Sequence, residues 1–93
     1  MTPEGRVKAK LKKYLAERNY YQYWPVPGGY GQQTVDCIVC CNSKFIAIEC
    51  KREGVEKPTP RQAADMKRMR ASGAATYVVT MRDGELVWLE QND

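Results

Sequence analysis

Histidine is absent from this sequence of 93 residues. Without an imidazole, the chain carries neither a Ser-His-Asp triad nor a Cys-His pair, and every histidine-bearing zinc site is excluded. Long apolar runs are missing as well. No stretch approaches the roughly 18–20 residues that a membrane span needs, and the charged N-terminus lacks the apolar segment of a signal peptide. We therefore expect a cytoplasmic protein that has no membrane partner.

The length and composition fit one small globular domain over residues 1–93. Hydrophobic residues make up 43% and charged residues 28%, which separates the sequence from disordered chains. Lysine and arginine number 15 against 11 acidic residues, for a net charge of +4. This mild excess favours an anionic partner such as nucleic acid, although many proteins without one share it.

Four cysteines, Cys37, Cys40, Cys41 and Cys50, fall within expected strands. Alternation along a strand places Cys37 and Cys41 on one face and Cys40 on the other, and CIVC lacks the glycine-containing turn of a zinc knuckle. We interpret the cysteines as buried reduced thiols that act as small hydrophobic residues, with a zinc site as the alternative. A disulfide is not expected in an intracellular chain.

Hydrophobic periodicity and turn residues predict an α/β domain with the element order αβββαββ. Thr2–Pro3 and Thr59–Pro60 each pair a capping residue with a proline, which is typical of a helix start. The two residues 42–43 separate two apolar runs and predict a hairpin. The expected elements are helices over 3–18 and 59–72, an extended aromatic segment over 19–27, and strands over 34–41, 44–51, 75–81 and 85–90. They suggest a mixed β-sheet with one crossover, flanked by helices in two or three layers.

One expected strand, over 44–51, carries Glu49 and Lys51 on the same face, about 7 Å apart. Asp36 is the only charge in the partner strand and lies toward the same open end of the hairpin. We expect the two carboxylates and the lysine to converge there. A hard divalent cation such as Mg²⁺ would offset the repulsion between the carboxylates and activate a phosphoryl group and a water. Lys51 would orient that water or stabilise charge in the transition state.

The same acid-x-lysine spacing occurs at Asp65 and Lys67, inside the second expected helix. Residues two apart on a helix point in nearly opposite directions, so no site is expected there. A position on a strand opposite Asp36, rather than the spacing alone, therefore favours a metal site. The alternative is a cross-strand ion pair that caps the end of the sheet.

Asp36 followed by Glu49-Cys50-Lys51 on the next strand resembles the core pattern of the PD-(D/E)XK nucleases. Within that superfamily, residues 2–80 resemble the virus-type replication-repair nuclease domain, VRR-NUC. The further matches are an opening-helix glutamate, GGYGQQTVD ahead of the aspartate, and TPRQ over 59–62. The sequence departs from the family at Val35, where a proline is usual. The resemblance implies a restriction-endonuclease-like core in an enzyme that hydrolyses DNA phosphodiester bonds and leaves a 5′-phosphate.

The resemblance also implies residue roles. Asp36 and Glu49 would bind Mg²⁺ or Mn²⁺ together with the backbone carbonyl of Cys50, and Lys51 would be the catalytic lysine. The family is typical of phages and bacteria, which implies the cytoplasm of a bacterium or of a phage-infected host cell. It also suggests symmetric homodimers that act on branched DNA such as Holliday junctions.

Two further residues match the family but have simpler interpretations. Glu4 matches a helix glutamate that approaches the metal ion, and Gln62 matches a glutamine near the site or the phosphate backbone, which we count with the catalytic residues. However, the first turn of any helix favours an acid, and Gln62 could be an ordinary surface residue.

Basic and aromatic residues provide candidate DNA contacts. We assign such contacts to four of the basic residues on the two expected helices, Lys8, Lys12, Arg61 and Arg68. The alternative is a solvated helix face. The aromatic residues Tyr20, Tyr21, Tyr23 and Trp24 either stack on unpaired bases or pack in a strand or a dimer interface.

The sequence therefore predicts a divalent-metal-dependent endonuclease that acts on branched DNA as a homodimer. A non-catalytic nucleic-acid-binding module with a structural acidic cluster stays open as a competing hypothesis, as does a zinc-stabilised interaction domain. Dependence on Mg²⁺ or Mn²⁺ would favour the nuclease, and tightly bound zinc would favour the zinc-stabilised interaction domain.

Overall fold

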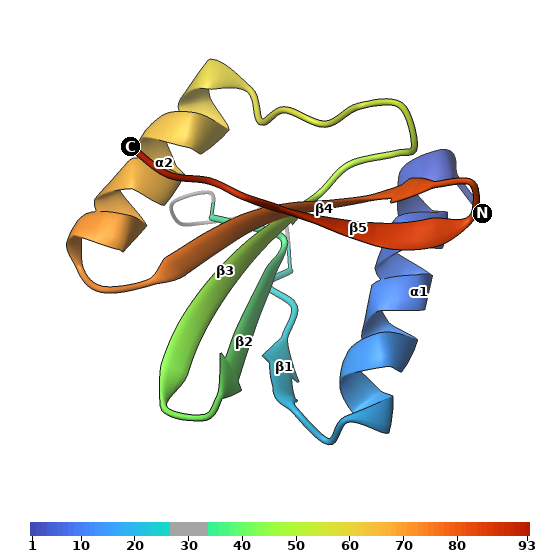
Figure 1. Ribbon diagram of the computed structural model, residues 1–93, viewed down its shortest axis with the longest axis horizontal. Helices are drawn as coiled ribbons and strands as arrows, with labels where there is room; N and C mark the ends of the chain where they lie inside the picture. Colours follow the sequence, from blue (N-terminus) through green and yellow to red (C-terminus); the bar gives the residue numbers. More distant parts are fainter. Residues whose placement is uncertain (27–33) are drawn as a thin grey trace.

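Figure 1 shows the computed structural model, which describes residues 1–26 and 34–93. Its elements are α1 (Pro3–Glu17), β1 (Tyr21–Tyr23), β2 (Cys37–Cys41), β3 (Lys44–Cys50), α2 (Pro60–Ala71), β4 (Ala75–Arg82) and β5 (Glu85–Glu90). This αβββαββ order is the predicted one. The loop expected at Gly28, Gly29 and Gly31 lies outside the described residues.

The strands form one mixed sheet with the spatial order β1-β2-β3-β4-β5. β3 and β4 are parallel, and all other neighbouring pairs are antiparallel. Parallel neighbours need a crossover, and here the chain leaves β3, passes through α2 and returns along β4. The end of β3 therefore lies in the centre of the sheet, with β2 and β4 on either side.

Both helices begin with the predicted caps. Thr2 Oγ1 accepts the Gly5 N–H at 3.0 Å ahead of α1. Ahead of α2, Thr59 Oγ1 accepts the Gln62 N–H at 3.2 Å, and Gln62 Oε1 accepts the Thr59 N–H at 2.9 Å. This reciprocal capping box satisfies N–H groups that a helix start leaves without partners. Neither helix is long and apolar enough to cross a membrane, and these are the helices of the described ranges 1–26 and 34–93.

The β2–β3 hairpin turns at Asn42 and Ser43, as predicted, and both residues have the positive φ of a type I′ turn. β2 is shorter than expected, because residues 34–36 lie outside the strand. The ladder ends at the Cys37–Ile48 pair. Beyond it, the Cys50 N–H bonds to the side chain of Asp36 instead of to the main chain of the opposite strand.

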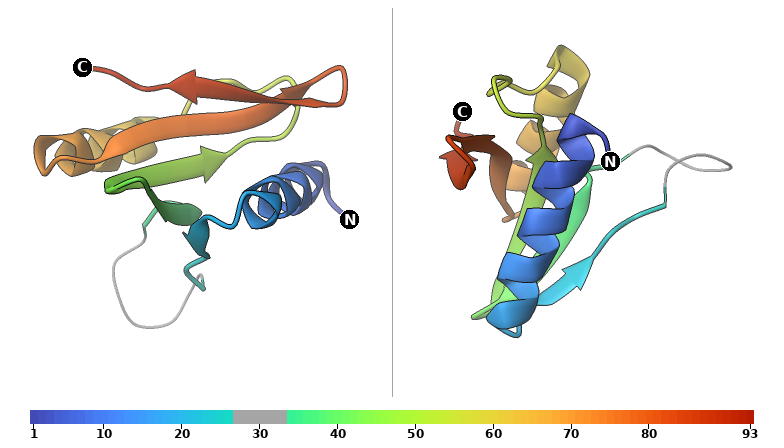
Figure 2. Two further views of the ribbon diagram at one scale, coloured as in Figure 1. Left: turned by 60° about the horizontal axis from the view of Figure 1, so that its bottom comes forward. Right: turned by 90° about the vertical axis from the view of Figure 1, so that its right-hand side faces the viewer.

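The helices lie on opposite faces of the sheet (Figures 1 and 2). Of the two arrangements that the sequence left open, the domain therefore has three layers. The larger core, on the α1 side, consists of Val7, Leu11, Leu15, Cys37, Val39, Ile48, Cys50 and Val79. The smaller core, on the α2 side, consists of Val35, Ala47, Met66 and Val78. Alternation along β3 therefore directs Cys50 toward α1 and Glu49 toward α2.

Candidate active site

The carboxylates of Asp36 and Glu49 come together where the β2–β3 hairpin opens. Cys37 and Ile48 are the last paired residues, so Asp36 and Glu49 occupy the next position on each chain. Asp36 Oδ2 accepts the Cys50 backbone N–H at 2.8 Å, which anchors its carboxylate to the end of β3. The predicted juxtaposition of the two acids is present.

Glu49 is a buried carboxylate, with only 4% of its surface exposed. Burial first, and then repulsion from Asp36, raise the pKa of Glu49 to about 8, against a lowering by Lys51. The positive charge of Lys51 therefore does not offset the cost of burying a charged Glu49 beside Asp36. Hard carboxylate oxygens with uncompensated charge suit Mg²⁺ or Mn²⁺, and Mg²⁺ commonly uses one or two carboxylates and keeps several waters.

The side-chain amide of Gln62 connects the start of α2 to this pair. Its Oε1 accepts the Thr59 N–H, and its Nε2 donates to Glu49 Oε2 at 3.1 Å. Gln62 therefore lies at the site, as the family resemblance implied. TPRQ over 59–62 already contained the sequence signal for this arrangement, because a capping box between Thr59 and Gln62 fixes the orientation of the Gln62 amide.

Lys8 occupies an unpredicted position between two acids. Its Nζ lies 3.5 Å from Glu4 Oε2 and 3.7 Å from Asp36 Oδ1. Burial acts to lower the pKa of Lys8, but the charges of Asp36 and Glu4 outweigh it and the net pKa is raised. The i, i+4 spacing of Glu4 and Lys8 on a helix was a sequence signal for the first ion pair, whereas the second depends on the fold.

Glu4 contacts Lys8 and does not join Asp36 and Glu49 in a cluster of three acids. Across the described part of the chain, no three Cys, Asp or Glu side chains converge on one point. A role for Glu4 at a metal ion stays a prediction. Two carboxylates with a backbone carbonyl, water and phosphate oxygens would still satisfy Mg²⁺.

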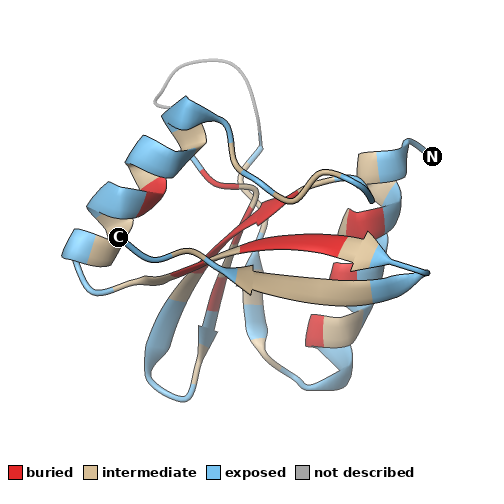
Figure 3. Ribbon diagram, turned by 45° about the horizontal axis from the view of Figure 1, so that its top comes forward, coloured by how far each residue is buried: buried red, intermediate tan, exposed pale blue. Residues whose placement is uncertain are grey.

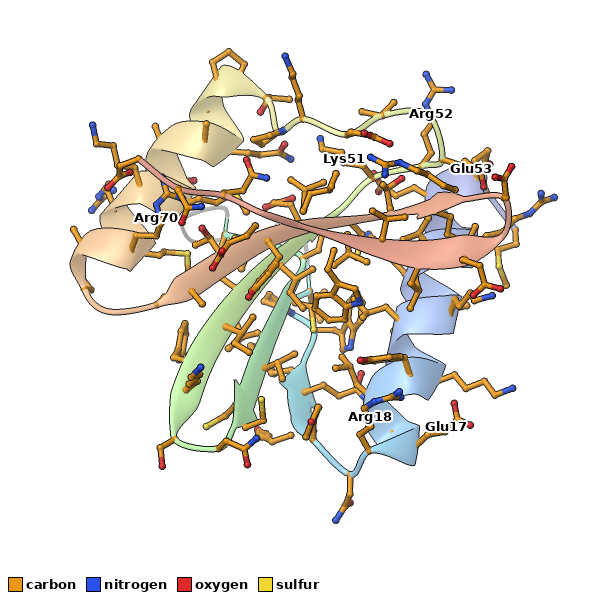
Figure 4. All side chains as sticks on the ribbon, viewed as in Figure 1. Glu17, Arg18, Lys51, Arg52, Glu53 and Arg70 are labelled. Carbon is orange, nitrogen blue, oxygen red and sulfur yellow. The ribbon has the colours of Figure 1, made fainter. Side chains whose placement is uncertain are left out.

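Lys51 follows β3 directly and is half-buried. Its backbone N–H donates to the Val79 carbonyl at 2.9 Å, which continues the parallel ladder and fixes its Cα. Figure 4 shows Lys51 where the chain leaves β3. Within the described residues its ammonium forms no ion pair, yet it lies close enough to lower the pKa of Glu49. This leaves the lysine available for a substrate or a water.

The cysteines do not form a metal centre. All four are free thiols. Burial raises the pKa of Cys37 to about 12 and raises that of Cys50 as well, so both stay protonated and pack in the α1-side core. The expectation of four buried thiols is wrong for Cys40, which is exposed because the sheet around it extends beyond α2. Cys41 is partly buried.

The other predicted DNA contacts are dispersed. Lys12 Nζ lies 4.8 Å from the centroid of the Trp24 ring, one turn of α1 beyond Lys8. Arg61 is exposed beside Gln62 in the first turn of α2, and Arg68 is exposed toward the end of that helix. Arg70 is instead structural, because it bonds to Thr76 Oγ1 at 2.7 Å and to the carboxylate of Asp93. Contact of Lys8, Lys12, Arg61 and Arg68 with DNA stays a prediction.

Comparisons with known proteins bear on the fold. Neither a protein-family model nor a curated protein sequence matches the chain. A solved structure does: the 1.6 Å structure of Hjc from Archaeoglobus fulgidus, a Holliday junction resolvase from an archaeal hyperthermophile. The TM-score is 0.73 at 16% identity, with 92% of this chain and 75% of that chain covered.

The two proteins share a restriction-endonuclease-like fold. The predicted fold class is therefore confirmed, including the mixed sheet with helices on its two faces. The narrower assignment to VRR-NUC is not confirmed, because no family model matches the chain.

Proposed function

We propose that this protein is a divalent-metal-dependent endonuclease that hydrolyses phosphodiester bonds in DNA and prefers branched substrates such as Holliday junctions. The observation that carries the proposal is the Asp36–Glu49 pair, in which burial and mutual repulsion raise the pKa of Glu49 to about 8. Burial beside a second acid disfavours the charged form of Glu49, and the neutral amide of Gln62 offsets only part of that cost, whereas a bound divalent cation would stabilise both carboxylates.

Each residue has a defined part in this proposal. Asp36, Glu49 and the backbone carbonyl of Cys50 would hold Mg²⁺ or Mn²⁺, which when bound supplies Lewis acidity toward a phosphoryl oxygen and a water. Gln62 holds the Glu49 carboxylate in place. Lys51 orients the attacking water and stabilises negative charge on the phosphoryl oxygens as the P–O bond breaks.

The preference for branched DNA and a homodimeric assembly form the finer part of the proposal. The fold shared with a Holliday junction resolvase and the resemblance to VRR-NUC domains support both. Two active sites related by a two-fold axis match the symmetry of a four-way junction.

A non-catalytic DNA-binding module is the second candidate. The ion pairs of Lys8 with Glu4 and Asp36 favour it, because they compensate part of the acidic charge without any metal ion. In that case the acids would only hold the end of the sheet together.

The deciding experiment incubates the purified protein with a labelled four-way junction and a matched linear duplex, in Mg²⁺, Mn²⁺ or EDTA. The expected result is cutting that depends on the metal ion and is lost in Glu49→Ala, with the junction cut faster than the duplex. Equal DNA binding in metal and in EDTA, with no cutting at all, would favour the binding module.

A further inference from the structure

The sheet face on the α2 side is only partly covered. α2 packs on β3 and β4, and on the same face toward β1 the register aligns Tyr21, Cys40 and Phe45 in one cross-strand row. Tyr23 lies on this face too, opposite Ile38. The three rings are strongly exposed: Tyr21 by 62%, Tyr23 by 55% and Phe45 by 46%. Figure 3 shows exposed residues on β1 and around the turn of the β2–β3 hairpin.

Strand alternation separates the aromatic residues of the N-terminal segment into two groups. Tyr20 and Trp24 pack against the α1-side core. Tyr21 and Tyr23 point to the other face, where Phe45 from β3 joins them. We call Tyr21, Tyr23 and Phe45 the aromatic face. Three exposed rings on one face of the sheet, with Cys40 between Tyr21 and Phe45, are not explained by the core of this chain.

An open groove of about 1010 Å³ adjoins the aromatic face between α2 and the start of β3. Phe45 and Lys44 line it from β3, and Arg68 lines it from α2. Asp65 and Glu90 line it as well, so the charge of the groove is mixed. A ligand that only offered phosphates would gain little here, whereas a ligand with flat rings and a few phosphates would use both kinds of surface.

We propose that the aromatic face stacks on unpaired bases of a DNA strand that continues from the cleavage site, with Lys44 and Arg68 on its phosphates. The proposal rests on the proposed function and narrows its substrate to DNA with an unpaired segment near the cut. Phe45 and Glu49 project from the same face of β3, about 13 Å apart along the strand. Ala47 lies between them and is buried under Met66 of α2, so the DNA strand would pass beside α2, over Ile38 of β2, to reach both.

Binding is the appropriate readout, because it is independent of cleavage. Fluorescence anisotropy in EDTA would compare a labelled single strand, a duplex, and a duplex with a single-stranded flap. Phe45→Ala and Tyr23→Ala should each weaken binding to the single strand and the flap by about fivefold or more, and leave duplex binding within about twofold. Phe45→Trp should restore binding, whereas Phe45→Leu should not, because leucine keeps the apolar surface but removes the π-face.

Three outcomes would overturn the proposal. Unchanged single-strand binding in both alanine variants would show that the rings do not contact bases. Equal recovery by Phe45→Leu would exclude stacking. Sedimentation could show that the wild-type protein is a dimer and that Phe45→Ala is a monomer. If this variant also bound all three DNAs equally more weakly, the aromatic face would be the contact with a second copy of the chain. Failure of the nuclease proposal alone would leave these binding results unaffected.

Discussion

Gln62 donates a hydrogen bond to Glu49 at 3.1 Å while its own carbonyl oxygen accepts the Thr59 N–H at 2.9 Å. One side chain thus ties the first turn of a helix to a buried acid on a central strand. The helix start also brings its partial positive charge near that acid. The site is therefore supported from α2 as well as from the hairpin that carries the acids.

Substitution of Gln62 should affect cleavage more than loss of the helix cap explains. Gln62→Ala removes both bonds, whereas Thr59→Ala removes only the hydroxyl that accepts the Gln62 N–H. Each should lower the free energy of unfolding by about 1 kcal/mol in urea titrations. Single-turnover cleavage should fall at least about tenfold in Gln62→Ala and clearly less in Thr59→Ala. Equal losses of cleavage would mean that the contact with Glu49 is unimportant.

The metal-free protein should lose stability as the pH rises from about 5 to 9. Folded Glu49 keeps its proton up to a pKa of about 8, while an unfolded glutamate releases it near 4.5. The folded state therefore binds more protons between these values, and the free energy of unfolding falls as pH rises, by about 4 kcal/mol. Urea unfolding in EDTA across this range should show a much flatter profile for Glu49→Gln. Parallel profiles would contradict the assignment of the raised pKa to Glu49.

Asp36 should contribute to stability as well as to the site, because it accepts the Cys50 N–H. Asp36→Ala leaves that N–H without its partner and should cost about 1–3 kcal/mol. Asp36→Asn keeps an acceptor oxygen and should cost less, yet cleavage should be lost in both. Thermal unfolding paired with a cleavage assay separates the two effects. An asparagine variant that cut normally would remove Asp36 from the metal site.

Lys8 should compete with the metal ion, since its ammonium lies between Glu4 and Asp36. Lys8→Met should tighten Mn²⁺ binding about threefold or more, as measured directly by electron paramagnetic resonance of free Mn²⁺. Lys13→Met removes the same charge from an exposed position of the same helix and should change the affinity little. Weaker Mn²⁺ binding in Lys8→Met would instead make the lysine a support of the site.

Lys51→Ala should abolish cleavage without loss of fold or DNA affinity. The side chain is half-buried and forms no ion pair with a described residue, so its removal leaves no acidic group without its ion-pair partner. The cleavage rate should fall by at least about a hundredfold, which is typical for loss of a group that stabilises transition-state charge. Circular dichroism and anisotropy in EDTA would verify fold and binding, with Arg52→Ala as the exposed neighbouring control. Cleavage at the wild-type rate would refute the role of Lys51.

Local patterns determined much of this protein. The threonine-proline caps, the Asn42–Ser43 turn and strand alternation depend on residues a few positions apart, and each predicted feature is present. Alternation on β3 and the two-residue turn were also enough to bring Asp36 to Glu49, because a hairpin with a fixed turn has a fixed register. The match to the family's motifs added Gln62, which the local pattern alone treated as an ordinary helix residue.

The tertiary structure decided what depends on contacts between distant segments. Lys8 meets Asp36 only because α1 packs on one face of the sheet, and the Gln62 amide meets Glu49 only because α2 packs on the other. β2 begins at Cys37 because the Asp36 carboxylate takes the Cys50 N–H, a bond that no periodicity predicts. Packing also determined which rings of the aromatic segment are exposed. The alternation of a strand can be predicted from its sequence, but the element that packs against the sheet decides which face is buried.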